Sequence, residues 1–409
     1  MNQMIVVPPQ PASPPLPTKL VSFSGDRAEF SQLVRRGALL ELVTVGFYRF
    51  WLATDIRRHL WSNTAIDGDA AEYTGRGREL LIGFLFALAI LVPIYLAYFL
   101  IGLEVERFKA FASFPLFLFF YLFGQFAIYR ARRYRLTRTV WRGVRFWMDG
   151  SGWAYAGRAA LWGLMMIPTL GLILPWREAA LERYKMQHCH YGDLQGSFAG
   201  TGKEFFKRGW WLWLLVVAVI FGIAMFPAVA VKFRAYPVAK FAPLVSLAGF
   251  VSLPFIYGAF KAVEWRWWIS GIRFGEVRFE ASLARGALIG LYWKVIGWFV
   301  LIAVSFGGYL FASACIIARI SHVPVAQLFT QGNLHGGIPM LVLSGVGYLA
   351  FILVMNVVLR VYLLRDLWER LANSTTVHQI EAIDSVSARG DLASALGEGF
   401  ADGLDIVGF

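Results

Sequence analysis

Long, nearly uncharged stretches of apolar residues recur along the chain. Three of them, Leu80–Leu103, Gly209–Val231 and Ile338–Leu364, each run for about 20 residues or more. That is the length a helix needs to cross about 30 Å of hydrocarbon. A helix in a soluble core does not need to be apolar on every side. The pattern therefore predicts helices that span a membrane.

Together, the apolar stretches predict an all-α integral membrane protein with six transmembrane helices in three pairs. The expected spans are 80–103, 110–129, 209–231, 241–262, 287–318 and 338–362. Two further stretches, 37–53 and 159–176, are short and are interrupted by charges or by Pro168 and Gly171. We interpret them as re-entrant or interfacial helix-turn-helix elements that precede two of the pairs.

The distribution of charge predicts the orientation. The chain has 39 lysines and arginines and a net charge of +13. Six of these cations lie in the short connections between paired spans: Arg107, Lys109, Lys232, Arg234, Lys240 and Arg319. The other 33 lie in or beside the segments on the opposite side. The positive-inside rule places that larger group, and both termini, in the cytoplasm.

An offset of 125 residues aligns two parts of the chain without a gap. Seven identities result, namely Thr44 with Thr169, Gly46 with Gly171, Trp51 with Trp176, Arg58 with Arg183, Gly75 with Gly200, Gly77 with Gly202 and Glu79 with Glu204. Each copy holds a T-x-G turn, a small cytoplasmic β-hairpin with Asp and Gly at its turn, and a G-x-G-[RK]-E segment that opens a span. We interpret the two parts as repeats.

The spans and repeats divide the chain into five parts. They are a disordered Pro-rich arm (1–22), a first repeat (23–130), a second repeat (131–262), a partial third repeat (263–372) and an acidic cytoplasmic tail (373–409). The tail either docks on the basic cytoplasmic face or is disordered, and the sequence leaves both open.

A cluster of arginines interleaved with aromatic residues follows the second expected span. Its members are Arg130, Arg132, Arg133, Arg135, Arg138, Arg142 and Arg145. Arginines at a membrane surface attract anionic lipids, and aromatic rings favour the interface. The cluster predicts contacts with anionic lipid of the cytoplasmic leaflet, either specific or as general anchoring. The same arrangement, beside apolar spans, argues against nucleic acid as a partner.

Residue patterns that carry chemistry are weak in this chain. His188, Cys189 and His190 are adjacent, so they cannot all reach one ion, and we expect no metal. The glycines of the two G-x-G segments could cradle a phosphate at a helix N-terminus, but we favour a helix cap beside lipid headgroups over a dedicated ligand site. No catalytic residue and no cofactor is predicted, and whether the protein is an enzyme stays open.

Several motifs resemble the YjgN-like family of bacterial inner-membrane proteins, which is defined by a domain of unknown function. They are FSGDRAEF near the start, LLELVTVGFYRFWLATDIRRHLWSNTAIDGDAAEYTGRGREL, and GEGFADGLDIVGF at the C-terminus. The resemblance covers residues from about 20 to 409, and Glu41 departs from the family pattern. It implies a location in the bacterial inner membrane and no activity.

Two functions from different classes follow. The first is the non-enzymatic handling of a lipid, solute or ion through a groove or pore between the repeated helices. Interrupted helices favour it, because they line cavities. The second is a membrane scaffold or accessory subunit that binds another membrane protein through its basic cytoplasmic face. The lack of ionisable residues at the span centres favours the second.

Overall fold

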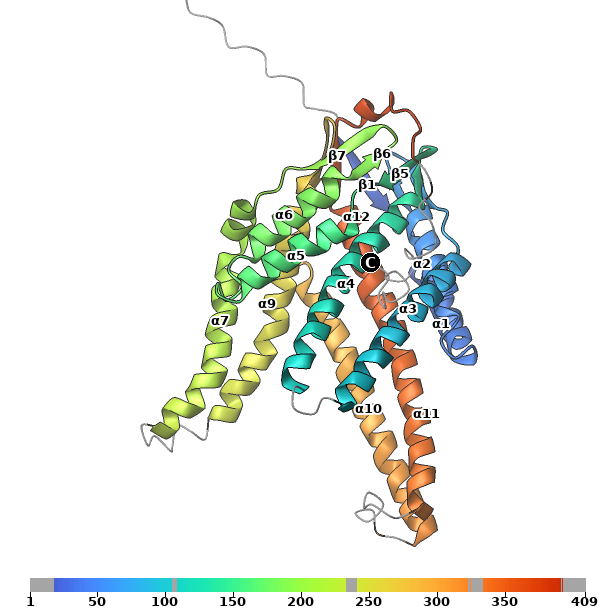
Figure 1. Cartoon of the computed structure of the whole chain (residues 1–409), viewed down its shortest axis with the longest axis vertical. Coiled ribbons are helices and arrows are strands. Elements are labelled where there is room, and N and C mark those ends of the chain that lie inside the picture. The colour runs from blue at the N-terminus through green and yellow to red at the C-terminus, as the bar shows by residue number, and fades with distance from the viewer. Residues whose placement is uncertain are drawn as a thin grey trace, which may run out of the picture.

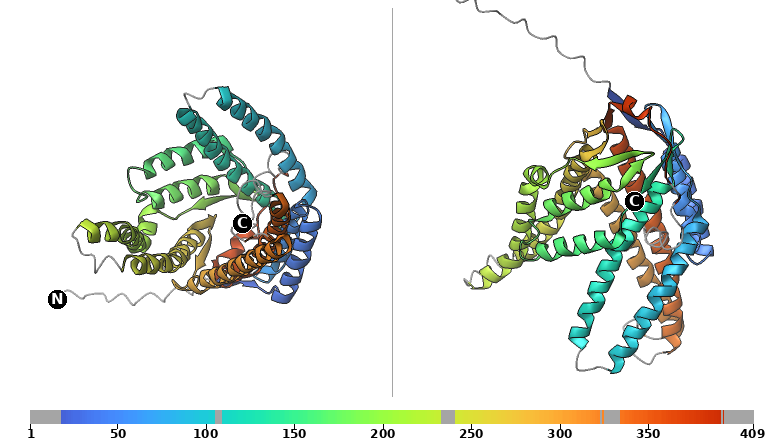
Figure 2. Two further views of the ribbon diagram at one scale, coloured as in Figure 1. Left: turned by 90° about the horizontal axis from the view of Figure 1, so that it is seen from below. Right: turned by 45° about the horizontal axis from the view of Figure 1, so that its top comes forward.

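Short strands form a closed barrel at one end of the molecule, and long helices extend away from it (Figure 1). The computed structural model describes residues 18–104, 109–232, 241–322, 324, 334–390 and 392. The views in Figure 2 show the helical pairs spreading apart as they extend away from the barrel.

The barrel consists of ten antiparallel strands. They are β1 (Thr18–Phe23), β2 (Thr64–Ile66), β3 (Asp69–Tyr73), β4 (Thr139–Trp141), β5 (Val144–Met148), β6 (Cys189–Tyr191), β7 (Leu194–Phe198), β8 (Ile272–Phe274), β9 (Val277–Ala281) and β10 (Thr375–His378). Consecutive strands pair, and β1 pairs with both β2 and β10, which closes the ring.

Two-residue turns join the strands of four hairpins. Asp67 and Gly68 connect β2 to β3, and both have positive φ, as do Arg142 and Gly143 between β4 and β5. Gly192 and Gly275, which begin the turns of the β6–β7 and β8–β9 hairpins, also have positive φ. These conformations match the twist of the flanking strands, which is why hairpins favour them.

A pair of helices joins the strands of each of five other neighbouring pairs, namely β1–β2, β3–β4, β5–β6, β7–β8 and β9–β10. The helices are α1 (Arg27–Val43), α2 (Arg49–Ser62), α3 (Gly77–Glu104), α4 (Lys109–Thr137), α5 (Gly152–Met166), α6 (Leu174–Gln187), α7 (Gly202–Lys232), α9 (Ala242–Gly271), α10 (Ile289–Ser321) and α11 (Leu334–Val358). The last of these continues through the π-helical turn η3 (Leu359–Arg365) into α12 (Asp366–Asn373). The described residues thus form successive strand–helix–helix–strand segments, each of which leaves the barrel and returns to it.

Side chains fill the interior of the barrel. Phe146 on β5 and Phe274 on β8 meet with ring centroids 6.0 Å apart, although two strands lie between them in the sheet. Their contact therefore crosses the lumen. Trp141 and Tyr191 are buried beside them, and the Tyr191 hydroxyl donates to the Trp141 carbonyl oxygen at 3.0 Å. The barrel is consequently a packed core and not a channel.

The expectation of an all-α protein with six spans and only small hairpins is wrong. Within the described residues five helical segments are long and apolar enough to cross a membrane, and the strands close into a ten-stranded barrel. The five segments are Gly77–Leu100, Gly202–Phe226, Ala242–Gly271, Ile289–Ser321 and Ile338–Asn373. The expected span 110–129 lies in α4. The side chains of α4 are described from Pro115 onward, and that stretch runs into Arg130 and Arg132, whose charge lowers its hydropathy.

Strands also occur in the segments assigned to the Pro-rich arm and to the acidic tail, for which docking and disorder were both left open. β1 begins at Thr18, inside the supposed arm 1–22, and β10 lies in the supposed tail 373–409. Beyond β10, the 3-10 turn η4 (Ile380–Ile383) packs Ile380 into the main core, and Asp384 pairs with Arg142 at 3.1 Å. Residues 1–17 and 393–409, including the GEGFADGLDIVGF motif, lie outside the described residues.

Candidate functional site

The two T-x-G turns have the same geometry. Gly46 between α1 and α2 has φ of +87°, and Gly171 between α5 and α6 has φ of +80°. In each turn the threonine hydroxyl donates to the carbonyl oxygen four residues earlier, at 2.7 Å for Thr44 and 2.8 Å for Thr169. The intervening Val45 and Leu170 are 86% and 79% exposed. These turns therefore end in apolar tips that point away from the protein.

The second glycine of each G-x-G segment allows two helices to meet closely. A Cβ on Gly77, at the start of α3, would lie 2.7 Å from the Cα of Trp51 on α2. A Cβ on Gly202, at the start of α7, would lie 2.7 Å from the Cα of Trp176 on α6. The first glycines, Gly75 and Gly200, lie under the rings of the aromatic residues two positions earlier. Close packing thus accounts for both glycines of each segment.

The acidic residues of the two segments have different partners. Glu79 accepts from Arg138 and from the Tyr134 hydroxyl, both at 2.9 Å. Glu204 pairs with Arg208 one turn later on α7. Arg58 donates to the Gly75 carbonyl oxygen at 2.9 Å, while Arg183 lies exposed on α6.

Most members of the arginine cluster bind other parts of the chain. Arg132 pairs with Glu182 at 3.1 Å, and Arg138 with Glu79. Arg142 contacts Asp67, Asp69 and Asp384. Arg145 donates to the Thr137 carbonyl oxygen at 2.5 Å, Arg130 lies 5.7 Å from the Phe126 ring centroid, and Arg133 lines a cavity beside Asp149. Arg135 is in the last turn of α4. These arginines join α4 and the β4–β5 hairpin to their neighbours, and their contact with lipid stays a prediction.

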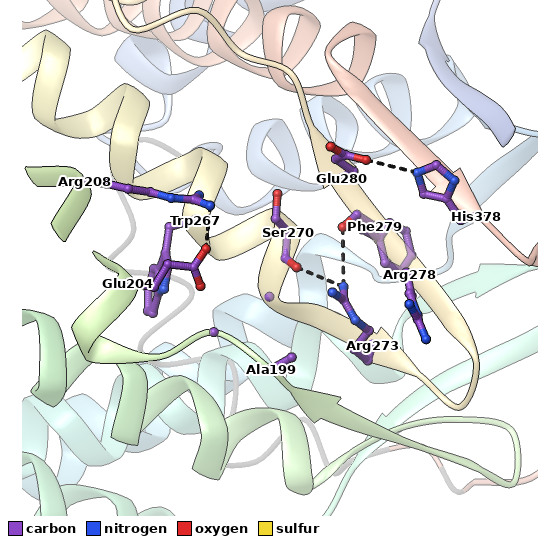
Figure 3. Close-up of a pocket in the computed structure, with 12 residues that line it drawn as sticks. Ala199, Glu204, Arg208, Trp267, Ser270, Arg273, Arg278, Phe279, Glu280 and His378 are labelled. Carbon is purple, nitrogen blue, oxygen red and sulfur yellow. Dashed lines mark hydrogen bonds and ion pairs between the residues drawn. The ribbon is translucent and has the colours of Figure 1, made fainter. Parts of the chain in front are cut away.

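A cavity of about 460 Å³ lies where α7 and α9 meet the barrel (Figure 3). Glu204 and Arg208 border it from α7, and Arg273 and Arg278 border it from the β8–β9 hairpin. The remaining lining residues are Ala199, Gly200, Trp267, Ser270, Gly271, Phe279, Glu280 and His378. Its volume lies within the range of small-molecule sites, about 300–1,000 Å³.

Three basic side chains form a row along the barrel wall of this cavity. Arg273 is the cross-strand partner of Arg278, and Arg278 is the partner of His378. Glu280 contacts His378 at 3.3 Å, and Glu204 contacts Arg208. Burial, with a further contribution from Arg278, lowers the pKa of the Arg273 guanidinium, and Glu204 opposes this shift without cancelling it. The direct contacts of the two carboxylates of the cavity are thus with Arg208 and His378, and Glu204 acts on Arg273 only through space.

A second polar cavity, of about 270 Å³, adjoins the first through Trp267. Its other lining residues are Glu178, Glu182, Lys261, Glu264, Trp265 and Trp268. Burial disfavours the ionised form of Glu182, but Lys185 and Arg132 outweigh it and lower the pKa of the Glu182 carboxyl to about 2. Burial raises the pKa of Glu178. Lys261 pairs with Glu264 at 2.6 Å. This cavity is lined by ion pairs that compensate one another.

The side chains of His188, Cys189 and His190 contact different parts of the protein. The Nδ1 atom of His188 lies 2.7 Å from Asp149, Cys189 is buried in the barrel, and His190 stacks on Trp147. Across the described parts of the chain, no group of three or more His, Cys, Asp or Glu side chains could hold a metal ion.

Sequence reasoning missed the basic row. The segment IRFGEVRFEA contains a signal for it, because a two-residue turn at Gly275 and Glu276 sets Arg273 opposite Arg278. His378 enters from β10, about a hundred residues later, and no local pattern indicates that pairing.

Comparison with known proteins identifies a family but no activity. The family model described as "Bacterial protein of unknown function (DUF898)" matches residues 18–403. This match confirms the resemblance to the YjgN-like family. No curated protein and no solved structure matches the chain.

Proposed function

The chain belongs to the bacterial family DUF898, whose function is unknown, and from that premise we propose that it is a multi-pass inner-membrane protein that binds a lipid. Binding takes place at the junction between the barrel and the apolar helices, and it leaves the lipid chemically unchanged. The barrel lies on the cytoplasmic side, and the helices cross the bilayer.

The exposure of the five apolar segments supports the membrane location. Only 6–17% of the most apolar window of each segment is buried inside the protein. In water, so large an exposed apolar surface would promote aggregation, whereas in a bilayer it is solvated by acyl chains. The described ends of the chain both lie at the barrel, because β1 pairs with β10. The excess of Lys and Arg toward that end supports a cytoplasmic barrel.

The position of the cavity beside tryptophans carries the proposal of lipid binding. On α7, the lining residue Arg208 is followed within five residues by Trp210, Trp211 and Trp213. Tryptophans concentrate at the level of the lipid headgroups. The cavity therefore opens where a headgroup lies, and the exposed side chains of Leu214 and Leu215 continue along the helix where acyl chains would lie. The filled barrel favours such a groove over a pore through the lumen.

We also propose that residues 23–130 and 131–262 arose by duplication. The matching φ angles of Gly46 and Gly171 support this, as do the matching contacts of Gly77 with Trp51 and of Gly202 with Trp176. Both sets of contacts involve residues aligned by the 125-residue offset.

Purification in a mild detergent, followed by native mass spectrometry and lipid analysis, tests the proposed function. We expect a defined number of lipid molecules that survive detergent exchange and whose composition differs from the bulk membrane. An unrelated inner-membrane protein purified in parallel is the control. Loss of all lipid on exchange, or a composition equal to that of the membrane, would contradict the proposal.

A further inference from the structure

The basic row on the outer face of β8, β9 and β10 is electrostatically unfavourable by itself. Side chains directly opposite each other on antiparallel strands have Cβ atoms about 4.5–5.5 Å apart, and like charges in such a pair are destabilising. Arg273 and Arg278 form such a pair. Glu204 offsets part of the repulsion at Arg273 through space, but neither carboxylate lies in contact with the pair, because Glu204 contacts Arg208 and Glu280 contacts His378.

The two arginines differ in how they are held. The Nη1 atom of Arg273 donates to the carbonyl oxygens of Ser270 and Ile272, at 2.9 and 2.8 Å, which fixes the plane of its guanidinium. The side chain of Arg278 is exposed and makes no hydrogen bond or ion pair with any residue that the structure describes. Figure 3 shows both on the β8–β9 hairpin at the edge of the cavity. One guanidinium is thus pre-oriented, and the other is available to a ligand.

We propose that this cavity binds a phosphate group, with Arg273 and Arg278 as its principal ligands and His378 at the end of the row. Guanidinium groups suit phosphate because their planar N–H donors match two phosphate oxygens at once. An anion placed between the arginines replaces their repulsion with two attractive contacts. The volume of about 460 Å³ leaves room for the group to which the phosphate is esterified.

This inference rests on the proposed function and names the part of the lipid that is recognised. The same chemistry is present in a phospholipid headgroup and in a free phosphate ester. The tryptophans of α7 favour the lipid, because they place the cavity at headgroup level.

The test uses the full chain in one detergent and in lipid nanodiscs. Binding of a short-chain phosphatidic acid, of diacylglycerol, which lacks phosphate, and of glycerol 3-phosphate is measured by titration. The variants are Arg273→Gln and Arg278→Gln. The matched control is Lys203→Gln, which removes one exposed cation near the start of α7 without lining the cavity. Thermal melting of each variant checks that it folds, and Arg278→Gln should fold because its side chain has no partner to lose.

We expect each arginine variant to bind phosphatidic acid about tenfold more weakly, since a charge-assisted hydrogen bond contributes that order of affinity. Lys203→Gln should stay within about twofold of the wild type, and diacylglycerol should bind poorly to all proteins. Arginine-dependent binding of glycerol 3-phosphate but not of phosphatidic acid would support the phosphate site and contradict the lipid function. Unchanged phosphatidic acid binding in both folded arginine variants would overturn the phosphate site and leave lipid binding intact. A wild type that binds no lipid at all would overturn the proposed function itself.

Discussion

Replacing Gly202 with alanine should destabilise the protein by separating α7 from α6. The added methyl group would lie 2.7 Å from the Cα and 2.8 Å from the Cγ of Trp176. Because a backbone atom cannot rotate out of the way, α7 would have to move. Overpacking of this kind lowers the free energy of unfolding by about 1–3 kcal/mol, and the higher helix propensity of alanine raises it by at most about 1 kcal/mol. We expect a net loss of about 1–2 kcal/mol in the free energy of unfolding.

Denaturant and thermal unfolding of the full chain in one detergent would measure this loss. Gly209→Ala is the matched control on the same helix, where the nearest atom to the new methyl is Cγ1 of Val263 at 4.0 Å. That variant should be neutral or slightly stabilised. Gly77→Ala should lose about as much as Gly202→Ala, because it meets Trp51 at the same distance. If Gly202→Ala and Gly209→Ala unfold alike, the close approach of the two helices does not limit stability.

Three further predictions concern the turns, the buried charges and the orientation. Gly171→Val should lose more than about 1 kcal/mol of stability, because φ of +80° is strained for a β-branched residue. The control, Gly222→Val, lies at an uncrowded site in α7 and should lose less. Equal melting temperatures of the two variants would contradict the strain at Gly171. The Glu182 carboxyl has an ordinary pKa of 4.5 and a pKa of about 2 in the folded protein. Its contribution to stability is therefore full above about pH 4.5 and is lost as the pH falls toward 2. Glu182→Gln should abolish that part of the pH dependence of the unfolding free energy, and an unchanged pH profile would refute this prediction. Reporter fusions should indicate the periplasm after residues 236 and 330 and the cytoplasm near residues 150 and 275. A periplasmic signal at residue 150 would contradict the proposed cytoplasmic location of the barrel.

Local sequence signals predicted the apolar helices and two of the hairpins. A membrane span is encoded by consecutive apolar residues, and the β2–β3 and β6–β7 turns contain adjacent Asp and Gly. The β4–β5 hairpin was missed because its turn is Arg142–Gly143, and its arginines resemble a membrane-surface cluster. Strands of three to six residues carry too little alternation to stand out beside long apolar helices.

Closure of the barrel could not be predicted from local pattern. The β1–β10 pairing joins Leu20 to Thr376 across nearly the whole chain. The candidate site has the same difficulty, because it combines Glu204, the pair Arg273 and Arg278, and His378 from three separate segments. Only the partnership of Arg273 with Arg278 lies within one hairpin, and it was therefore open to prediction once the hairpin was recognised.

The pairing of β1 with β10 has a consequence for how the protein is made. During synthesis β1 emerges first, but its β10 neighbour appears only after every helix described between them has left the ribosome. Until then, on the proposed membrane topology, each hairpin is held between helices that are already entering the bilayer, and the ring keeps two unpaired strand edges. Such edges attract other strands and promote aggregation. A chain truncated just before Thr375 would contain all five apolar segments, but β1 and β9 would lack the strand that joins them.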